Sequence, residues 1–247
     1  MHSNDVVLIN EEGLRVDGRR PNEMRPFKII AGYLSNADGS AYIELGRNKI
    51  IAAVYGPREV HPKYLALPHR ATVRCRYSMA PFSVEERKSP GRSRREIELS
   101  KVIREALEPA IFVEEYPRTV IDIFIQVLEA DGGTRTASIT AASVALADAG
   151  IPMRDLVAAI AVGKAGDTLL LDLNGIEDQY GDGDMPIAMM PHYNLVTLFQ
   201  ADGMFAPEEI DEALKMAKEA IYRLYEGQKE ALKRKYLKIR EEVLNSE

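Results

Sequence analysis

Two glycines and an arginine lie where a strand-like segment gives way to a helix-like one, at Gly132, Gly133 and Arg135. The glycines permit a tight turn and a close approach of the backbone to a ligand. The N–H groups at a helix start bind anions, Thr134 adds a hydroxyl donor, and the guanidinium adds a planar set of donors. The segment therefore predicts a phosphate site, with an ordinary strand-to-helix turn capped by Thr134 as the alternative. It is not a P-loop, because no Gly-Lys-Ser/Thr follows the glycines.

Arg94 and Arg95 begin another segment with helical periodicity. Each cation in a first helical turn opposes the helix dipole by roughly 0.3–1 kcal/mol, so local preference does not explain these arginines. Arg135 breaks the same rule at its own helix. Two such violations suggest that both helix starts face one bound anion or polyanion. A solvated basic turn, in which the arginines pair with Glu96 or Glu98, is the alternative.

Asp178 and Asp184 flank a glycine-rich segment. Carboxylates spaced in this way can converge on a divalent cation such as Mg²⁺, or act as an acid and a metal ligand. The segment is expected to be a loop between two paired strands, at 169–173 and 185–190. A solvated hairpin turn is the alternative, because Asp182-Gly183 is a favourable turn dipeptide.

A basic loop is expected over residues 60–70, where Lys63, His69 and Arg70 lie near Tyr64. Cations and an aromatic ring in one loop can guide a single-stranded nucleic acid through phosphate contacts and base stacking. An ordinary solvated loop explains the same composition. The loop is therefore a candidate RNA contact.

Charge is unevenly distributed along the chain, whose formal net charge is −6. Residues 61–104 hold 11 Lys or Arg against four acids, which is a local footprint for phosphates. Residues 167–184 hold six acids and no Lys or Arg. The net charge argues against a general polyanion binder, while the distribution suggests one site for an anion together with a metal or an acid.

Periodicity predicts the elements that must position these side chains. Helices are expected over 94–110, 135–149 and 207–245, with a capping box of Ser93 and Glu96 at the first and a kink or break at Gly227 in the last. Strands are expected over 27–33, 41–45, 50–55, 71–79, 119–128, 157–163, 169–173, 185–190 and 195–200. This order favours an α+β protein with helices on one side of a largely antiparallel sheet. Residues 1–25 are expected to form an irregular arm, and no linker divides 26–247, which indicates a single domain.

Several classes of protein are disfavoured by composition. The longest apolar stretch, at 156–162, is far short of the ~18 residues that a membrane span needs, and residues 1–20 are too polar for a signal peptide. The single cysteine, Cys75, cannot form an internal disulfide, and the four histidines show no zinc-ligand spacing. A soluble cytoplasmic protein without a structural metal is expected.

Taken in order, these segments resemble the RNase PH family over nearly the whole chain, and within it the catalytic ring subunits of the archaeal exosome. The resemblance is carried by Arg15-Val-Asp-Gly-Arg19, Tyr77-Ser-Met-Ala-Pro-Phe-Ser83, Ser93-Arg-Arg-Glu-Ile-Glu98, Asp131-Gly-Gly-Thr-Arg135, Asp148-Ala-Gly-Ile-Pro152 and Asp184-Met-Pro186.

The resemblance implies a ribosomal protein S5 domain 2-like fold with a long C-terminal helix. It also implies phosphorolysis of single-stranded RNA from the 3′ end, with inorganic phosphate as co-substrate and nucleoside 5′-diphosphates as products. By residue, it assigns phosphate binding to Arg95, Gly133, Thr134 and Arg135, RNA binding to Lys63, Arg70 and Arg94, and catalysis with Mg²⁺ binding to Asp178 and Asp184. The family's ring is a trimer of heterodimers with an inactive sister chain, capped by RNA-binding subunits.

Two other functions compete with a catalytic exosome subunit. A non-catalytic RNA-binding ring subunit would keep the basic loops without needing Asp178 and Asp184, so the presence of both acids disfavours it. A stand-alone RNase PH that trims tRNA differs mainly in partner and substrate. The doubled Arg94-Arg95 and the long charged C-terminal segment favour the exosome subunit.

Overall fold

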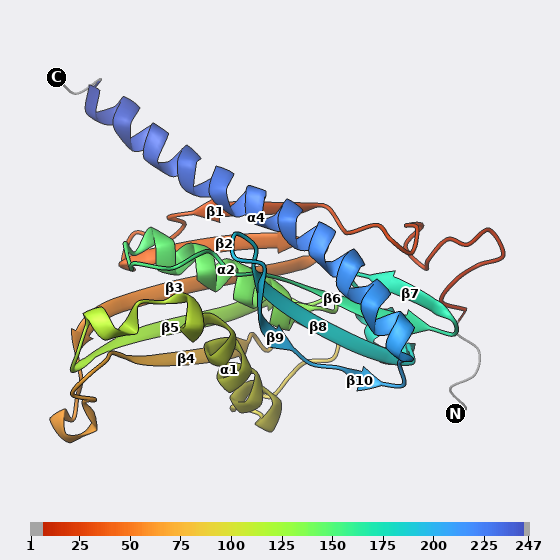
Figure 1. The fold of residues 1–247 in the computed structure, drawn as a ribbon, viewed down its shortest axis with the longest axis horizontal. Helices are drawn as coiled ribbons and strands as arrows, with labels where there is room; N and C mark the ends of the chain where they lie inside the picture. The colour runs from red at the N-terminus through yellow and green to blue at the C-terminus, as the bar shows by residue number, and fades with distance from the viewer. Residues whose placement is uncertain (1–6, 245–247) are drawn as a thin grey trace.

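Two sheets form the body of the protein in the computed structural model, which describes residues 7–244 (Figure 1). The first sheet has the order β1-β2-β3-β5-β4. Its strands are β1 (Phe27–Ala31), β2 (Gly39–Leu45), β3 (Asn48–Glu59), β4 (Thr72–Met79) and β5 (Thr119–Glu129). All neighbours in it are antiparallel except β4 and β5, which run parallel.

The second sheet has the order β10-β8-β6-β7, with β9 also paired to β8. Its strands are β6 (Ala158–Ala165), β7 (Thr168–Leu171), β8 (Gly183–Met190), β9 (Leu195–Phe199) and β10 (Asp202–Gly203). Every pairing in this sheet is antiparallel. One hydrophobic core includes residues of both sheets, so the two sheets pack as parts of one body.

Four α-helices accompany the sheets in the described part of the chain: α1 (Arg94–Leu107), α2 (Thr134–Asp148), α3 (Gly175–Tyr180) and α4 (Pro207–Leu244). Helix α2 packs against β2 and β3 of the first sheet and β6 of the second, and nearly all of its residues are buried. Its many alanines allow this close approach on several sides. Helix α4 crosses α2 and β6 and extends past the end of β1 (Figure 1).

The predicted α+β class, the long C-terminal helix and the capping box at the start of α1 are confirmed. The predicted strands are all present with small shifts at their ends, and the first helix ends at Leu107 before a 3₁₀ turn. Residues 7–26 contain no helix and no strand, apart from one isolated β-bridge of Ile9 with Arg15. Within residues 7–244, no helix is both long and apolar enough to span a membrane.

Three expectations about local structure are wrong. The segments 169–173 and 185–190 do not pair with each other, because β7 and β8 both pair with β6. The acidic stretch between them is not a simple loop but contains α3, which Asn174 caps. Helix α4 also runs through Gly227 without a break. A Cβ there would lie 2.4 Å from the Phe27 ring, so this glycine permits close packing.

Replacing Gly39 by alanine is expected to lower the free energy of unfolding by about 2–3 kcal/mol. The added Cβ would lie 2.2 Å from the Ala149 backbone nitrogen and 2.3 Å from the Ala145 carbonyl oxygen, so α2 would have to shift away from β2. Urea unfolding followed by circular dichroism measures the change.

The matched control is Gly91→Ala, whose Cβ would meet nothing closer than Ser89 Oγ at 3.8 Å. Its stability is expected to stay within about 0.5 kcal/mol of the unmodified protein. Equal stabilities of the two variants would contradict the packing argument.

Candidate active site

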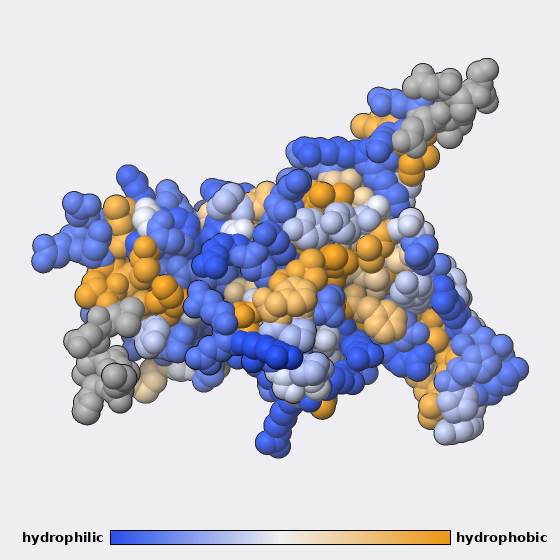
Figure 2. Space-filling model, turned by 180° about the vertical axis from the view of Figure 1, so that it is seen from behind, coloured by the Kyte–Doolittle hydropathy of each residue, from blue (hydrophilic) through white to orange (hydrophobic). Residues whose placement is uncertain are grey.

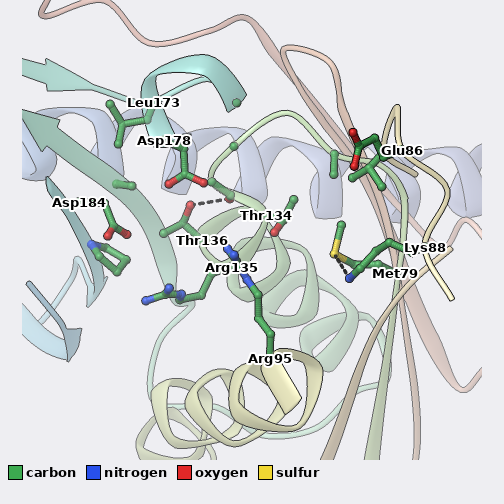
Figure 3. A pocket seen from close by; sticks show the side chains of 17 residues that line it. Met79, Glu86, Lys88, Arg95, Thr134, Arg135, Thr136, Leu173, Asp178 and Asp184 are labelled. Carbon is green, nitrogen blue, oxygen red and sulfur yellow. Dashed lines mark hydrogen bonds between the residues drawn. The ribbon is translucent and has the colours of Figure 1, made fainter. Parts of the chain in front are cut away.

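A cavity of about 440 Å³ opens where the starts of α1 and α2 meet α3 and β8 (Figure 3). Its lining includes six residues that the sequence singled out: Arg95, Gly133, Thr134, Arg135, Asp178 and Asp184. These residues come from four separate segments of the chain, between Arg95 and Asp184. The structure therefore brings the predicted anion-binding residues and the predicted acids to one place.

The start of α2 forms the end of the cavity where an anion site was predicted, here called the anion-binding end. Gly132 and Gly133 have φ angles of 66° and 67°, in the left-handed region that favours glycine. Gly133 is the N-cap residue and Thr134 the first residue of the helix, so Thr134 is not the cap that the alternative prediction assumed. No side chain of residues 7–244 caps α2, which leaves N–H groups of its first turn available to an anion.

Side chains from two other segments hold this turn in place. Asn48 donates from Nδ2 to the Gly132 carbonyl at 2.5 Å and accepts from the Asp131 N–H at 2.7 Å. Arg25 donates to the carbonyls of Asp131 and Gly132. Asp131 in turn accepts from the Gly175 N–H at 2.9 Å, which fixes the start of α3 against the turn. The two ends of the cavity are thus linked by backbone and side-chain hydrogen bonds.

Tyr77 orients the first hydroxyl of α2. Its phenol donates to Thr134 Oγ1 at 2.9 Å, which leaves the Thr134 hydroxyl hydrogen free to point elsewhere. Burial raises the pKa of Tyr77 to about 12, so the phenol keeps its proton at neutral pH. Thr134 can therefore act as a donor to an anion in the cavity.

The start of α1 contributes a cation that has no carboxylate partner. The alternative pairing of the arginines with Glu96 or Glu98 is absent from the described residues, because Glu96 binds backbone groups. Although burial disfavours the charged form of Glu96, the N–H groups of Ser93 and Met79 hold its pKa below the usual value. Arg95 extends from α1 toward the start of α2 (Figure 3).

The acids lie at the other end of the cavity, Asp178 in α3 and Asp184 near the start of β8. Burial, together with the nearby charges of Asp178 and Asp202, raises the pKa of Asp184, although Arg135 and Arg95 act in the opposite direction. Asp184 therefore keeps a proton at higher pH than an ordinary aspartate does. A carboxyl of this kind beside two cations is suited to proton transfer.

Three neighbouring acids serve the fold and not the cavity. Glu177 accepts from Arg15 Nε at 2.7 Å, and both side chains are fully buried. Asp172 accepts from Arg25 Nη2 at 2.7 Å. Asp182 binds the Gly166 N–H at 2.7 Å. These contacts separate the structural acids of residues 167–184 from the two that face the cavity.

The three predicted RNA contacts do not line the cavity. Arg94 is exposed beside it, on the first turn of α1. Lys63 lies in an exposed 3₁₀ turn and pairs with Glu59 at 2.7 Å, while Arg70 pairs with Glu108. The basic loop precedes β4, whose far end reaches the cavity at Met79, so roughly 23 Å of strand separates the two. The RNA-binding roles of these residues stay predictions.

Other residues at the site were not singled out from sequence. Glu86 and Lys88 line the cavity from the loop after β4, and Arg25 and Asn48 support it. Lys88 belongs to the basic run of residues 61–104, but nothing in the sequence marks it among eleven cations. Arg25 and Asn48 act on residues more than 80 positions away, which no local pattern reveals.

Two family models match the chain, one after the other. The 3′ exoribonuclease family, domain 1, matches residues 23–152, and domain 2 of the same family matches residues 155–220. The chain belongs to the 3′ exoribonuclease, or RNase PH, family. The two matches place the start of α2 in the first segment and Asp178 and Asp184 in the second, so the cavity lies at their junction.

Relatives and solved structures agree with this membership. The chain is 62% identical over 239 residues to the exosome complex component Rrp41 of Thermococcus onnurineus, covering 97% of this chain and 96% of the relative. It is 57% identical over 228 residues to that of Cenarchaeum symbiosum, covering 92% and 94%. Among solved structures, rice Rrp46 matches with a TM-score of 0.77 and 25% identity over 87% of this chain and 98% of that one.

A chain of the Archaeoglobus fulgidus exosome with RNA bound to the active site matches with a TM-score of 0.75 and 24% identity, covering 87% of this chain and 92% of that one. The expected RNase PH fold is thus confirmed. These structural likenesses concern the fold. What the residues of the cavity do must be argued from their own chemistry.

Replacing Glu177 by glutamine is expected to lower the free energy of unfolding by about 3 kcal/mol, because it leaves the buried Arg15 guanidinium without a carboxylate. Urea unfolding measures the effect. The matched control is Glu230→Gln in α4, which breaks an exposed pair with Arg234 and is expected to cost about 0.5 kcal/mol or less. Equal losses in the two variants would contradict a structural role for the buried pair.

Proposed function

We propose that the chain is the catalytic subunit of an exosome of the archaeal type and degrades single-stranded RNA from its 3′ end by phosphorolysis. The observation that carries the proposal is the cavity itself, where an uncapped helix start and two arginines face two aspartates. An anion site beside an acid with a raised pKa suits transfer of a phosphoryl group to inorganic phosphate.

In this reaction an oxygen of inorganic phosphate bonds to the phosphorus of the last phosphodiester. The bond from that phosphorus to the 3′-oxygen of the preceding nucleotide breaks, and that oxygen takes up a proton. The products are a nucleoside 5′-diphosphate and an RNA shortened by one nucleotide. Two anionic groups must meet for this to occur, so the reaction needs positive charge at the point of contact.

The residues of the cavity can supply these requirements. Backbone N–H groups after Gly133, the Thr134 hydroxyl and the guanidinium groups of Arg95 and Arg135 hold inorganic phosphate and offset the repulsion. Asp184 is the carboxyl placed to protonate the departing 3′-oxygen, because burial favours its protonated form.

The donor set also fits Mg²⁺. Asp178 and Asp184 line the same cavity, and no group of three or more His, Cys, Asp or Glu that could hold a metal occurs within residues 7–244. Mg²⁺ is commonly held by one or two carboxylates, with substrate phosphates and water completing its ligands. When bound, it supplies positive charge to the transferred phosphoryl group.

RNA is proposed to reach the cavity past Arg94, with Lys63 and Arg70 contacting phosphates farther along the strand. Contacts to phosphates and sugars predict little sequence preference. The proposed partners are an inactive sister chain in a trimer of heterodimers and RNA-binding cap subunits, and the proposed location is the cytoplasm. The identities to exosome components support this assignment over a stand-alone tRNA-trimming enzyme.

Asp184→Asn and Arg135→Ala are each expected to abolish phosphate-dependent release of nucleoside diphosphates, because one lacks the acid and the other a phosphate ligand. The purified protein, alone and with its sister chain, is incubated with single-stranded RNA with and without phosphate, and the nucleotides are separated by chromatography. Assembly is expected to stay intact.

The matched control is Asp167→Asn, an exposed acid outside the cavity, which is expected to retain full activity. Undiminished degradation by the Asp184 variant, or release of monophosphates only, would overturn the proposed mechanism. Activity of a homohexamer without the sister chain would favour the stand-alone enzyme.

Removal of divalent cations with EDTA is expected to stop phosphate-dependent release, and Mg²⁺ is expected to restore it. Asp178→Asn should shift the Mg²⁺ concentration for half-maximal rate upward, because a carboxylate ligand of the metal becomes a neutral amide. Initial rates across a Mg²⁺ series at saturating phosphate measure the shift. Full activity in EDTA would rule out the metal's role.

A further inference from the structure

Arg135 is held by a neutral side chain. Its Nη1 donates to Gln200 Oε1 at 2.5 Å, and this is its one hydrogen bond to another side chain in the described part of the protein. No carboxylate of residues 7–244 forms an ion pair with it. Arg135 turns toward the β8 side of the cavity, where Asp184 lies (Figure 3).

Gln200 is itself anchored. It directly follows β9, and its backbone N–H donates to the Pro186 carbonyl of β8 at 3.2 Å. Pro186 lines the cavity. The amide is therefore fixed to the strand that carries Asp184, while the arginine it holds belongs to α2. The hydrogen bond between Arg135 and Gln200 therefore joins the two family segments.

An amide and a carboxylate would act differently on this guanidinium. Both accept an N–H and restrict a long, flexible side chain. A carboxylate would also neutralise the positive charge and compete with phosphate for the remaining donors. An amide oxygen leaves the charge intact, and a guanidinium has five N–H donors, of which this contact uses one.

We propose that Gln200 is a positioning residue for the phosphate site, holding Arg135 so that its charge and its remaining N–H groups stay directed into the cavity. The inference rests on the proposed phosphorolytic function and adds a residue from the second family segment to it. Gln200 does not line the cavity, so it acts on phosphate through Arg135.

Two substitutions separate orientation from charge. Gln200→Met keeps the length of the side chain and removes the acceptor, and it is expected to raise the KM for phosphate about fivefold with kcat and the KM for RNA little changed. Gln200→Glu keeps an acceptor and adds a charge, and it is expected to raise the KM for phosphate more, about tenfold or above. Initial rates of nucleoside diphosphate release are measured across phosphate and RNA series.

Binding provides a second readout that does not depend on turnover. Inorganic phosphate should raise the Tm of the unmodified protein, because a ligand that binds only the folded state stabilises it. Gln200→Met should show a smaller increase at the same phosphate concentration. A merely structural role would lower the Tm without phosphate and leave the increase unchanged. Gln179→Met, an exposed glutamine of α3 outside the cavity lining, is the matched control and should behave as the unmodified protein.

The inference is overturned if Gln200→Met has an unchanged KM for phosphate and an unchanged phosphate-dependent increase in Tm. It is also overturned if Gln200→Glu binds phosphate as tightly as the unmodified protein. Failure of the unmodified protein to release nucleoside diphosphates would instead remove the proposed function. Normal release with no effect of the Gln200 variants would remove this inference alone.

Discussion

The site depends on the hydrogen bonds that fix the turn between β5 and α2 against the start of α3. Arg25 and Asn48 bind carbonyl and N–H groups of this turn. The Asp131 carboxylate, which belongs to the turn, accepts from the Gly175 N–H and so holds the start of α3. These side chains thus bind polar backbone groups of the turn itself. The first N–H groups of α2 face the cavity without a side-chain cap from residues 7–244. The same bonds set the distance between the anion-binding end and the acidic end. Asp178 lies in the same cavity as the start of α2 because α3 is fixed beside the turn.

The buried acids of residues 167–184 stabilise the fold, whereas two less buried acids of the same stretch face the cavity. Asp172 and Glu177 are the buried acids of the acidic stretch, and each is paired with an arginine that precedes β1 (Figure 1). An unpaired charge at either position would be costly, so the arginines are needed there. Asp178 and Asp184 have no such partner within residues 7–244 and face cationic groups across open space. That space is where a phosphate or a metal ion would complete the charge balance. Figure 2 shows the molecule from behind the view of Figure 1, with apolar residues gathered in patches between polar ones.

Local signals in the sequence were sufficient for the strands, the three longer helices and both helix starts, because periodicity and capping act over a few residues. The six-residue α3 was missed because it is too short to show periodicity, and its Asn174 cap precedes a glycine. Gly227 was misread because a glycine that breaks a helix and one that admits the Phe27 ring look the same in sequence. The pairing of β7 and β8 with β6 is a tertiary choice between alternatives of similar composition. The approach of Arg95 and Arg135 was predicted because cations at two helix starts broke a local rule, and Asp184 was added by the acidic stretch and the family resemblance.

Two contacts that sequence could not reveal act across the junction between the two family segments. Asp131 binds the backbone of α3 and Gln200 binds Arg135, so each side contributes a group that orients the other. Neither contact has a sequence signature, because its partner lies 44 or 65 positions away. The contacts that hold the two family segments together are therefore the same contacts that orient the side chains of the cavity. A change at the junction can displace phosphate from the acid without altering any residue that touches either one, since a small misplacement of reacting groups is enough to slow a reaction.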